Sequence, residues 1–398
     1  MTKATAPSGL WIAKKMLKPL ASLKLTVVLL AMAILLVFCG SLAQRFEDNW
    51  TVVGTYFRTA FVWIPFQIFF VKEIPGAFPF FGGWLIGGVL LVNVLAAHAV
   101  RFKMAWPRAG IFLIHLGLIV MLLSELFTGL FAREGNMTID IGGTSNYVEH
   151  MHSVELAIVD PSDRKMDDIT VIPQSILKKG GKIRHDLLPF DIMVKKYMVN
   201  SGIPKDPAWV QNPATAGQGL KTVVLERPGV TGTDSEQMVD MPSAYAELLK
   251  KGTSESLGTY LVSLWLDPQK VMFDGKTFEI SLRFKRTYKP YSLRLKEFRH
   301  DKYIGTDTPK NFSSLVRLED PLRNVDREVL IYMNHPLRYA GETFYQASFK
   351  PDDSATILQV VRNQGWFMPY ISCAMVVIGL LAQFGIHLFK FLRRRAEA

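Results

Sequence analysis

The stretch LTVVLLAMAILLVFCGSLAQ, residues 25–44, carries no charged side chain between Lys24 and Arg45. A helix needs about 20 mostly apolar residues to cross the hydrocarbon core of a bilayer. Three further stretches are mostly apolar: 84–100, 366–389, and 109–132, which is interrupted only by Glu125. The sequence therefore predicts four transmembrane helices.

Composition agrees with a membrane protein. The chain has 398 residues, of which 49% are hydrophobic and 20% charged, with a net charge of +11. A soluble protein has about 25% charged residues. The basic residues flank the apolar stretches, where they determine topology. We therefore expect no nucleic-acid partner.

The basic residues predict the orientation of the chain, because short cytoplasmic loops are enriched in Lys and Arg. They form three groups: Lys14, Lys15, Lys18 and Lys24; Arg101, Lys103 and Arg108; Lys390, Arg393, Arg394 and Arg395. With four spans, all three groups lie on one side. Residues 1–24 and 390–398 are then cytoplasmic, and the loop 45–83 and the domain 133–362 lie outside.

The outer loop contains a short aromatic segment, residues 59–71, with Phe61, Trp63, Phe66, Phe69 and Phe70. It is too short to cross, and its aromatic side chains are typical of a membrane–water interface. The alternative is a strand packed on the outer domain.

Residues 133–362 alternate apolar and polar side chains in short runs, such as 153–159, 277–284 and 356–361. This alternation predicts half-buried antiparallel strands. The chain is thus predicted to be an α+β membrane protein, with four transmembrane helices and a large extracytoplasmic antiparallel β-rich domain. Residues 243–251 are predicted to form a helix, and 203–219 a loop. Residues 334–346 are expected to form strand, turn and strand around Ala340-Gly341.

No catalytic constellation stands out in the predicted outer domain, which has no nucleophile elbow, phosphate-binding loop or zinc spacing. His150 and His152 are two residues apart and would share one face of a strand. We interpret them as a solvated pair, with metal or heme contact as the alternative.

Three segments resemble the ResB/CcsB family of system II cytochrome c biogenesis proteins. They are ASLKLT at residues 21–26, FSSLV at 312–316 and YMNHPLRYAGETFYQAS at 332–348. The last is similar to the family's Asn-x-Pro-Leu … Gly-x-x-Phe-Tyr-Gln block, which lies shortly before the final span. The resemblance covers most of the chain, and residues 160–275 match only in character.

The resemblance implies a function and partners. Such proteins pair with a ResC/CcsA-type membrane protein, carry heme b outward without a covalent bond, and attach it to the Cys-x-x-Cys-His motif of apocytochrome c. The partner holds a tryptophan-rich heme-handling motif, which this sequence lacks. The chain is then one non-catalytic subunit of a synthase complex in the bacterial inner membrane. Thiol-reducing periplasmic proteins are a further possible partner.

Three histidines lie in the predicted spans: His98, His115 and His387. Heme iron is commonly bound by imidazole, and ionisable residues within a membrane are usually functional. At 1.5 Å per residue, His115 lies about 10 Å from Arg108, whereas His98 and His387 lie about 5 Å from the basic flanks. The last two could be interfacial residues, and His115 could be a hydrogen-bonded packing residue.

The resemblance implies one transmembrane ligand histidine, and His115 is the best candidate, with the second ligand from the partner. Gly110 and Gly117 on the same span are expected to leave room for the flat macrocycle. Glu125 is expected to pair with a nearby group such as Arg133. Cys39 and Cys373 are interpreted as small buried apolar residues, with a membrane thiol pair as the alternative.

Two other functions remain open from the sequence. The first is a b-type heme subunit that exchanges electrons with quinone, although such bundles usually carry histidine pairs in both halves of the membrane. The second is a membrane-anchored scaffold without a cofactor.

Overall fold

The computed structural model describes residues 17–70, 74–101, 106–162, 167–206, 210–231, 239–302, 305, 309–350 and 352–397. The chain divides into two compact units. The membrane unit comprises Met1–Arg133, Thr231–Thr233 and Asn363–Ala398, and the β unit comprises Glu134–Val230 and Asp234–Arg362. Lys14, Lys15 and Lys103 of the predicted basic groups lie outside the described residues.

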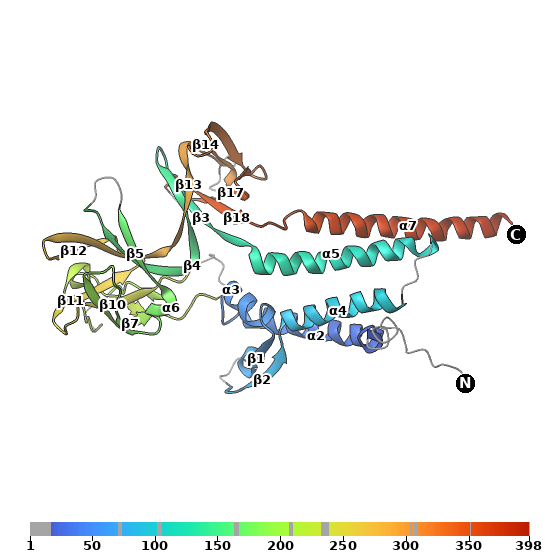
Figure 1. The fold of residues 1–398 in the computed structure, drawn as a ribbon, viewed down its shortest axis with the longest axis horizontal. Helices are drawn as coiled ribbons and strands as arrows, with labels where there is room; N and C mark the ends of the chain where they lie inside the picture. The colour runs from blue at the N-terminus through green and yellow to red at the C-terminus, as the bar shows by residue number, and fades with distance from the viewer. Residues whose placement is uncertain are drawn as a thin grey trace, which may run out of the picture. The chain divides into compact units, whose positions relative to one another are not determined.

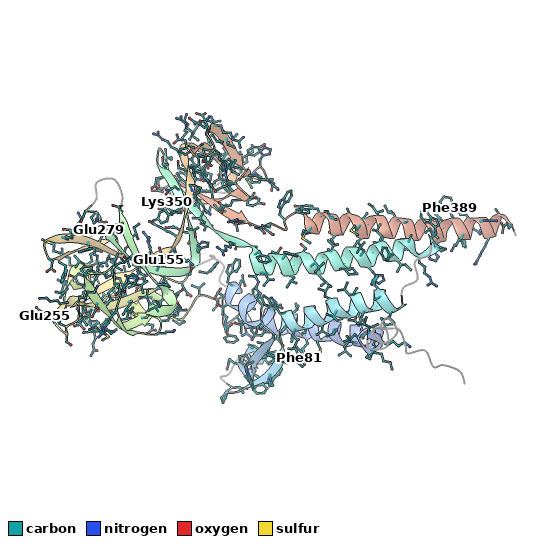
Figure 2. All side chains as sticks on the ribbon, in the orientation of Figure 1. Phe81, Glu155, Glu255, Glu279, Lys350 and Phe389 are labelled. Carbon is teal, nitrogen blue, oxygen red and sulfur yellow. The ribbon has the colours of Figure 1, made fainter. Side chains whose placement is uncertain are left out.

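Four helices of the membrane unit are long and apolar enough to span a bilayer. They are α2 (Leu23–Ala43), α4 (Gly83–Arg101), α5 (Ala109–Phe131) and α7 (Met368–Ala396). Their outer surfaces are apolar: Ile34 on α2 is largely exposed. So is Phe389 near the end of α7, which is labelled in Figure 2. Such surfaces require a lipid environment, and the chain is an integral membrane protein.

The helices pack as two pairs, α2 with α4 and α5 with α7 (Figure 1). A polar contact fixes the first pair, because Asn93 of α4 is buried at the beginning of α2. Its amide donates to the carbonyls of Leu20 and Ser22, and its Oδ1 accepts from Thr26 Oγ1 at 2.7 Å. The amide of Asn93 thus finds its partners within the apolar interface.

The segment between α2 and α4 contains α3 (Asn49–Val52), η1 (Val53–Phe57), β1 (Phe61–Pro65), η2 (Phe66–Phe69) and β2 (Ala77–Phe81). Strands β1 and β2 form an antiparallel hairpin. Val62 and Ile64 point into the core of the membrane unit, whereas Phe61 and Trp63 alternate with them and are exposed. The part of segment 59–71 up to residue 70 is therefore a strand and a 3₁₀ turn with one aromatic outer face. Residue 71 lies outside the described residues.

The β unit consists almost entirely of antiparallel strands. Its first elements are β3 (Arg133–Asp140), β4 (Thr144–Asp160), β5 (Asp168–Pro173), α6 (Gln174–Leu177), β6 (Gly181–Ile183), β7 (Phe190–Met198), β8 (Ser201–Gly202), η4 (Gly217–Leu220) and β9 (Leu225–Glu226). The rest are β10 (Ser243–Lys250), β11 (Ser256–Ser263), β12 (Gln269–Phe273), β13 (Lys276–Lys302), β14 (Pro309–Asp320), β15 (Val325–Tyr332), β16 (Leu337–Tyr339), β17 (Glu342–Phe349) and β18 (Ala355–Arg362). The predicted α+β architecture is confirmed.

Two hydrophobic cores lie along the long strands β4 and β13. A ten-stranded sheet has the order β15-β14-β13-β4-β3-β18-β17-β16, with β12 added to β13 and β5 to β4. The first core lies between the early half of β13 and the four-stranded sheet β11-β10-β7-β6. The second lies among β3 and β13–β18. Register shifts after Phe284 and Tyr288 interrupt the β13–β4 ladder between the two cores, as bulges do where a strand bends.

The predicted helix at 243–251 is wrong, because Ser243–Lys250 forms strand β10. Ala, Leu, Glu and Lys favour a helix locally. In the fold, β10 is central and pairs with β7 on one side and β11 on the other. Nearly all its side chains are buried. Burial on both faces and two ladders outweigh a local preference of a few tenths of a kcal/mol per residue.

The hairpin predicted at 334–346 is present as β16 and β17, which pair antiparallel. Ala340 and Gly341 both adopt positive φ, 51° and 77°, as a tight two-residue hairpin turn requires. Buried polar contacts fix the hairpin in the second core. Tyr339 donates to Asp320 at 2.7 Å, and Glu342 accepts from Tyr291 and Lys289.

Candidate functional site

Two of the three predicted histidines meet in the membrane unit. His98 of α4 and His115 of α5 have ring centroids 5.1 Å apart, with their planes at 72°. Phe112, one turn before His115, contacts His98 with ring centroids 6.1 Å apart. His98 lies three residues before the end of α4 and His115 six residues after the beginning of α5. Both therefore lie near the connection between these helices.

The hydrogen bonds of the two rings define their tautomers. Nδ1 of His98 lies 2.8 Å from the carbonyl oxygen of Val94, and Nδ1 of His115 lies 2.9 Å from that of Ile111. A carbonyl only accepts, so each Nδ1 carries the proton and each neutral ring has its lone pair on Nε2. Histidines that bind a metal usually have the other ring nitrogen fixed in this way.

His115 has the more available nitrogen. Its Nε2 makes no hydrogen bond to the part of the chain that the structure describes. The ring is half-buried, so a ligand can approach it from outside the helix pair. The arrangement can thus supply imidazole nitrogen to a metal centre from within the membrane unit.

Gly110 and Gly117 do not leave room for a flat ligand, which corrects that expectation. A Cβ on Gly110 would lie 2.6 Å from the carbonyl oxygen of Gly379, and one on Gly117 would lie 2.7 Å from Val376. Ser372 also donates to the carbonyl of Gly117 at 2.7 Å. The glycines let α5 and α7 approach closely, as small residues do between membrane helices.

His387 is separate from the histidine pair. It lies on α7, and its Nε2 is 2.9 Å from Nε2 of Gln383, one turn earlier on the same helix. Because the Gln amide nitrogen only donates, Nε2 of His387 accepts this hydrogen bond. An exposed, self-contained pair of this kind is an ordinary feature of a helix surface.

The two cysteines also lie apart. Cys39 is fully buried in the core around α2, whereas Cys373 of α7 is exposed, and both are free thiols. Cys39 is thus the predicted small buried residue. Cys373 is not, because its position on α7 faces outward.

Glu125 of α5 is exposed, and the structure shows no ion pair between it and Arg133 or any other described residue. The expected pair with Arg133 is therefore absent. The residue lies six positions before the end of α5, at the opposite end from His115.

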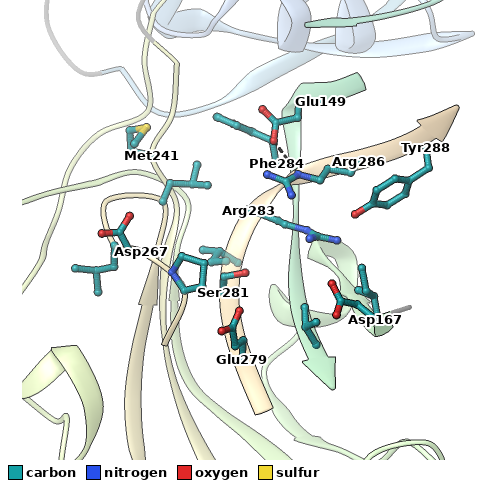
Figure 3. A pocket seen from close by; sticks show the side chains of 16 residues that line it. Glu149, Asp167, Met241, Asp267, Glu279, Ser281, Arg283, Phe284, Arg286 and Tyr288 are labelled. Carbon is teal, nitrogen blue, oxygen red and sulfur yellow. Dashed lines mark hydrogen bonds and ion pairs between the residues drawn. The ribbon is translucent and has the colours of Figure 1, made fainter. Parts of the chain in front are cut away.

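The β unit has a pocket of about 440 Å³ over one face of β13, shown in Figure 3. Its two arginines are already paired: Arg286 with Glu149 at 2.9 Å and Arg283 with Glu155 at 3.0 Å. The Arg286 guanidinium lies 4.1 Å from the ring centre of Tyr147, and burial raises the pKa of the Tyr147 hydroxyl. These charges fix β4 to β13.

The metal alternative for His150 and His152 is not supported. His150 uses both ring nitrogens, with Nδ1 donating to the carbonyl of Glu134 and Nε2 bonded to Thr287 Oγ1, each at 2.9 Å. It is therefore not the solvated residue that we expected. Among the residues that the structure describes, no group of three or more His, Cys, Asp or Glu could hold a metal ion.

Sequence reasoning missed the pairing of His98 with His115 and the role of Asn93. A signal for the first was available, because both histidines lie close to the short, basic connection between two antiparallel spans. A signal for Asn93 was its polarity within an apolar run, since such residues usually bond to a neighbouring helix.

Fold and site together define a class: a multi-pass membrane protein with an antiparallel β unit and an intramembrane histidine pair. Residues 264–357 match the model of the ResB-like family, a range that includes the blocks at 312–316 and 332–348. The predicted resemblance to the ResB/CcsB family is therefore confirmed, and over residues 264–357 the chain is similar to the ResB-like family.

A curated relative matches over a longer range. Protein NrfI of Wolinella succinogenes is 27% identical over 299 residues, which cover 74% of this chain. The chain spans only 29% of the length of that relative.

Proposed function

We propose that this protein is a ResB/CcsB-type subunit of a system II cytochrome c synthase. Together with a ResC/CcsA-type partner, it carries heme b across the inner membrane and presents it, with apocytochrome c, for covalent attachment. The family match, the four apolar helices and the large β unit support this function. The observation that carries it is the pair His98–His115, with both rings held in the tautomer that binds iron.

The residues present fit heme as a transported substrate. Iron in heme is bound by neutral imidazole, and each ring of the pair has its lone pair on Nε2, which is the more accessible nitrogen in the half-buried His115. We propose His115 as the ligand and a histidine of the partner chain as the second. His98 contacts the His115 ring. We assign it the role of positioning that ring, and it is the next candidate for the iron ligand. The carbonyl of Ile111 holds the proton on Nδ1 and orients the ring.

The proposed orientation places the histidine pair near the cytoplasm. Arg101 and Arg108 flank the connection between α4 and α5, and such loops are cytoplasmic by the positive-inside rule. A ligand at the cytoplasmic end of these helices would lie on the side of the membrane from which heme is carried outward. The β unit then lies outside, where apocytochrome c is presented.

The test is substitution of His115 in the full-length protein, co-purified with its partner. His115→Ala should remove heme from the complex and abolish maturation of a reporter cytochrome c, because iron loses an axial ligand. His115→Gly with imidazole in the medium should partly restore both, since free imidazole can occupy the vacated position. Heme content is measured from the absorption spectrum.

Matched substitutions separate the histidines. His387→Ala should keep its heme, because His387 bonds only within α7. His98→Ala should lose part of the heme and shift the spectrum. Full heme content and an unchanged spectrum in His115→Ala would show that the ligand assignment is wrong, and His98 would be the next candidate.

The same material tests the alternative of a b-type electron-transfer subunit. The described helices contain no histidine in the half remote from the α4–α5 connection, whereas such subunits usually pair histidines in both halves. Heme reducible by quinol, together with normal cytochrome c maturation in a deletion strain, would favour that alternative.

A further inference from the structure

Glu125 presents a carboxyl group on the surface of a membrane-spanning helix. It shares one exposed face of α5 with Leu118 and Met121, which lie seven and four positions earlier and are 42% and 38% exposed. Residues three, four and seven apart lie on the same face of a helix. A carboxyl group among leucine and methionine side chains is unusual, because charged residues inside a membrane nearly always face a partner or water.

Glu125 cannot easily reach the membrane surface. It lies about 9 Å along the axis from Phe131, the last residue of α5. Side chains of an α-helix tilt toward its N-terminus. The N-terminus of α5 is the end farther from Glu125. The glutamate therefore leans deeper into the bilayer. In either protonation state, its carboxyl group needs hydrogen-bond partners there, at a cost of a few kcal/mol if none is found.

We propose that the α5 face of Leu118, Met121 and Glu125 docks a transmembrane helix of a different chain. That helix carries a Lys, Arg or His side chain at the depth of Glu125. Charge complementarity identifies the occupant, since a basic side chain of the partner satisfies the Glu125 carboxylate. Apolar side chains of the same helix pack on Leu118 and Met121. The proposal rests on the proposed function only in expecting a membrane partner.

The transmembrane helices of a second copy do not supply the base. In the four described helices, Lys and Arg occur only at the ends: Lys24, Arg101 and the basic tail of α7. The nearest histidine, His115, lies about 15 Å from Glu125 along α5. A copy inserted in the same orientation places the bases of these four helices at the same wrong depths.

Arg58 is the rival partner within the chain. Its Nε lies 3.8 Å from the position of a Cβ on Gly129, one turn beyond Glu125. The structure shows no ion pair between them. A rotation of Arg58 is nevertheless a distinct outcome that the experiment must separate.

The experiment uses the full-length protein in its own membranes. A photo-crosslinking phenylalanine analogue is placed at Leu118, and at Leu381 on the exposed surface of α7 as the control. We expect Leu118 to form an adduct with a transmembrane segment that carries Lys, Arg or His, and Leu381 to react with lipid. Glu125→Lys should reduce the adduct about tenfold or more, as removal of a partner from a buried charge pair does.

A charge swap identifies the contact. Changing the mapped base of the partner to Glu in the Glu125→Lys background should restore the adduct. Reaction of Leu118 with lipid alone, or an adduct with a segment that lacks a base, would overturn the proposal. So would Arg58→Ala, if it produced the same loss of folded protein as Glu125→Ala while the Leu118 adduct was absent.

These outcomes are independent of heme delivery. If His115→Ala left heme and cytochrome c maturation intact, the proposed function would fail, while the crosslink at Leu118 would still report the docking face. If Glu125→Lys failed to insert, the wild-type crosslink at Leu118 and the identity of its partner segment would remain the test.

Discussion

At the scale of single residues, the contact between α5 and α7 depends on the absence of side chains. Gly110 and Gly379 face each other so closely that a Cβ on either would lie within 2.8 Å of the other's carbonyl oxygen. Backbone atoms cannot give way as a flexible side chain does. The approach exposes carbonyls of α5 to Ser372, which bonds to Gly117, so packing and hydrogen bonding depend on the same small residues.

Gly110→Ala should therefore destabilise the membrane unit by about 1–3 kcal/mol, the usual cost of overpacking a tight contact. The matched control is Gly87→Ala on α4, where a Cβ meets nothing within 4 Å. That change should be neutral or stabilising by up to about 1 kcal/mol, because alanine favours a helix. Thermal unfolding in detergent, followed by circular dichroism, measures both. Equal stability of the two variants would contradict the packing role.

The sequence predicted where the three histidines lie along their helices, but not which residues they face. Depth follows from distance along a helix, which counting provides. The direction in which a side chain of α5 points depends on the rotation of α5 about its own axis. That rotation is fixed by the packing of α5 against α4 and α7. Gly110 and Gly117 were therefore assigned to the wrong face, and the contact of His115 with His98 was missed.

At the scale of elements, the β16–β17 hairpin shows what a local pattern can predict. Ala340-Gly341 demanded a turn with positive φ wherever the hairpin lay in the fold. β10 shows the opposite case. Its sequence favours a helix, and only its position between β7 and β11 makes it a strand. Elements fixed by turn chemistry were predictable, and those fixed by distant pairing were not.

Asp320 connects the end of β14 to β16. Its buried carboxylate accepts from the Tyr339 hydroxyl at 2.7 Å and from the backbone N–H of Arg323 at 3.2 Å. The Tyr339 hydrogen bond, together with Arg323, holds the pKa of Asp320 below its usual value. A carboxyl group with a lowered pKa in the folded state stabilises the fold above its unfolded pKa, and this contribution is lost as pH falls through the folded pKa.

Asp320→Asn should therefore lower the thermal midpoint of the full-length protein at pH 7. The difference from wild type should stay constant down to about pH 4, near the unfolded pKa of Asp, and should close at lower pH. The exposed Asp301→Asn is the control and should change the midpoint little. A difference between Asp320→Asn and wild type that does not depend on pH would show that the ionised carboxylate is not the stabilising form.

At the scale of the whole molecule, the number and spacing of apolar helices determine how the chain crosses the membrane. Four spans return the C-terminus to the side of the N-terminus. The basic groups at the beginning of α2, between α4 and α5, and at the end of α7 then share one side. Each group independently favours the cytoplasm, so no span has to oppose its own flanking charges.

The topology prediction is tested in a chain whose own cysteines, Cys39 and Cys373, are replaced by serine. Gln211→Cys, exposed in the β unit, should react with a membrane-impermeant maleimide in intact cells, because the proposed topology places residues 133–362 outside. Arg394→Cys, exposed in the tail of α7, should react only after the membrane is permeabilised. Protection of Gln211→Cys from the maleimide in intact cells would contradict the four-span topology. Labelling of both cysteines in intact cells would instead mean that the basic tail is outside, against the positive-inside rule. The paired positions make each outcome interpretable, since one cysteine serves as the accessibility control for the other.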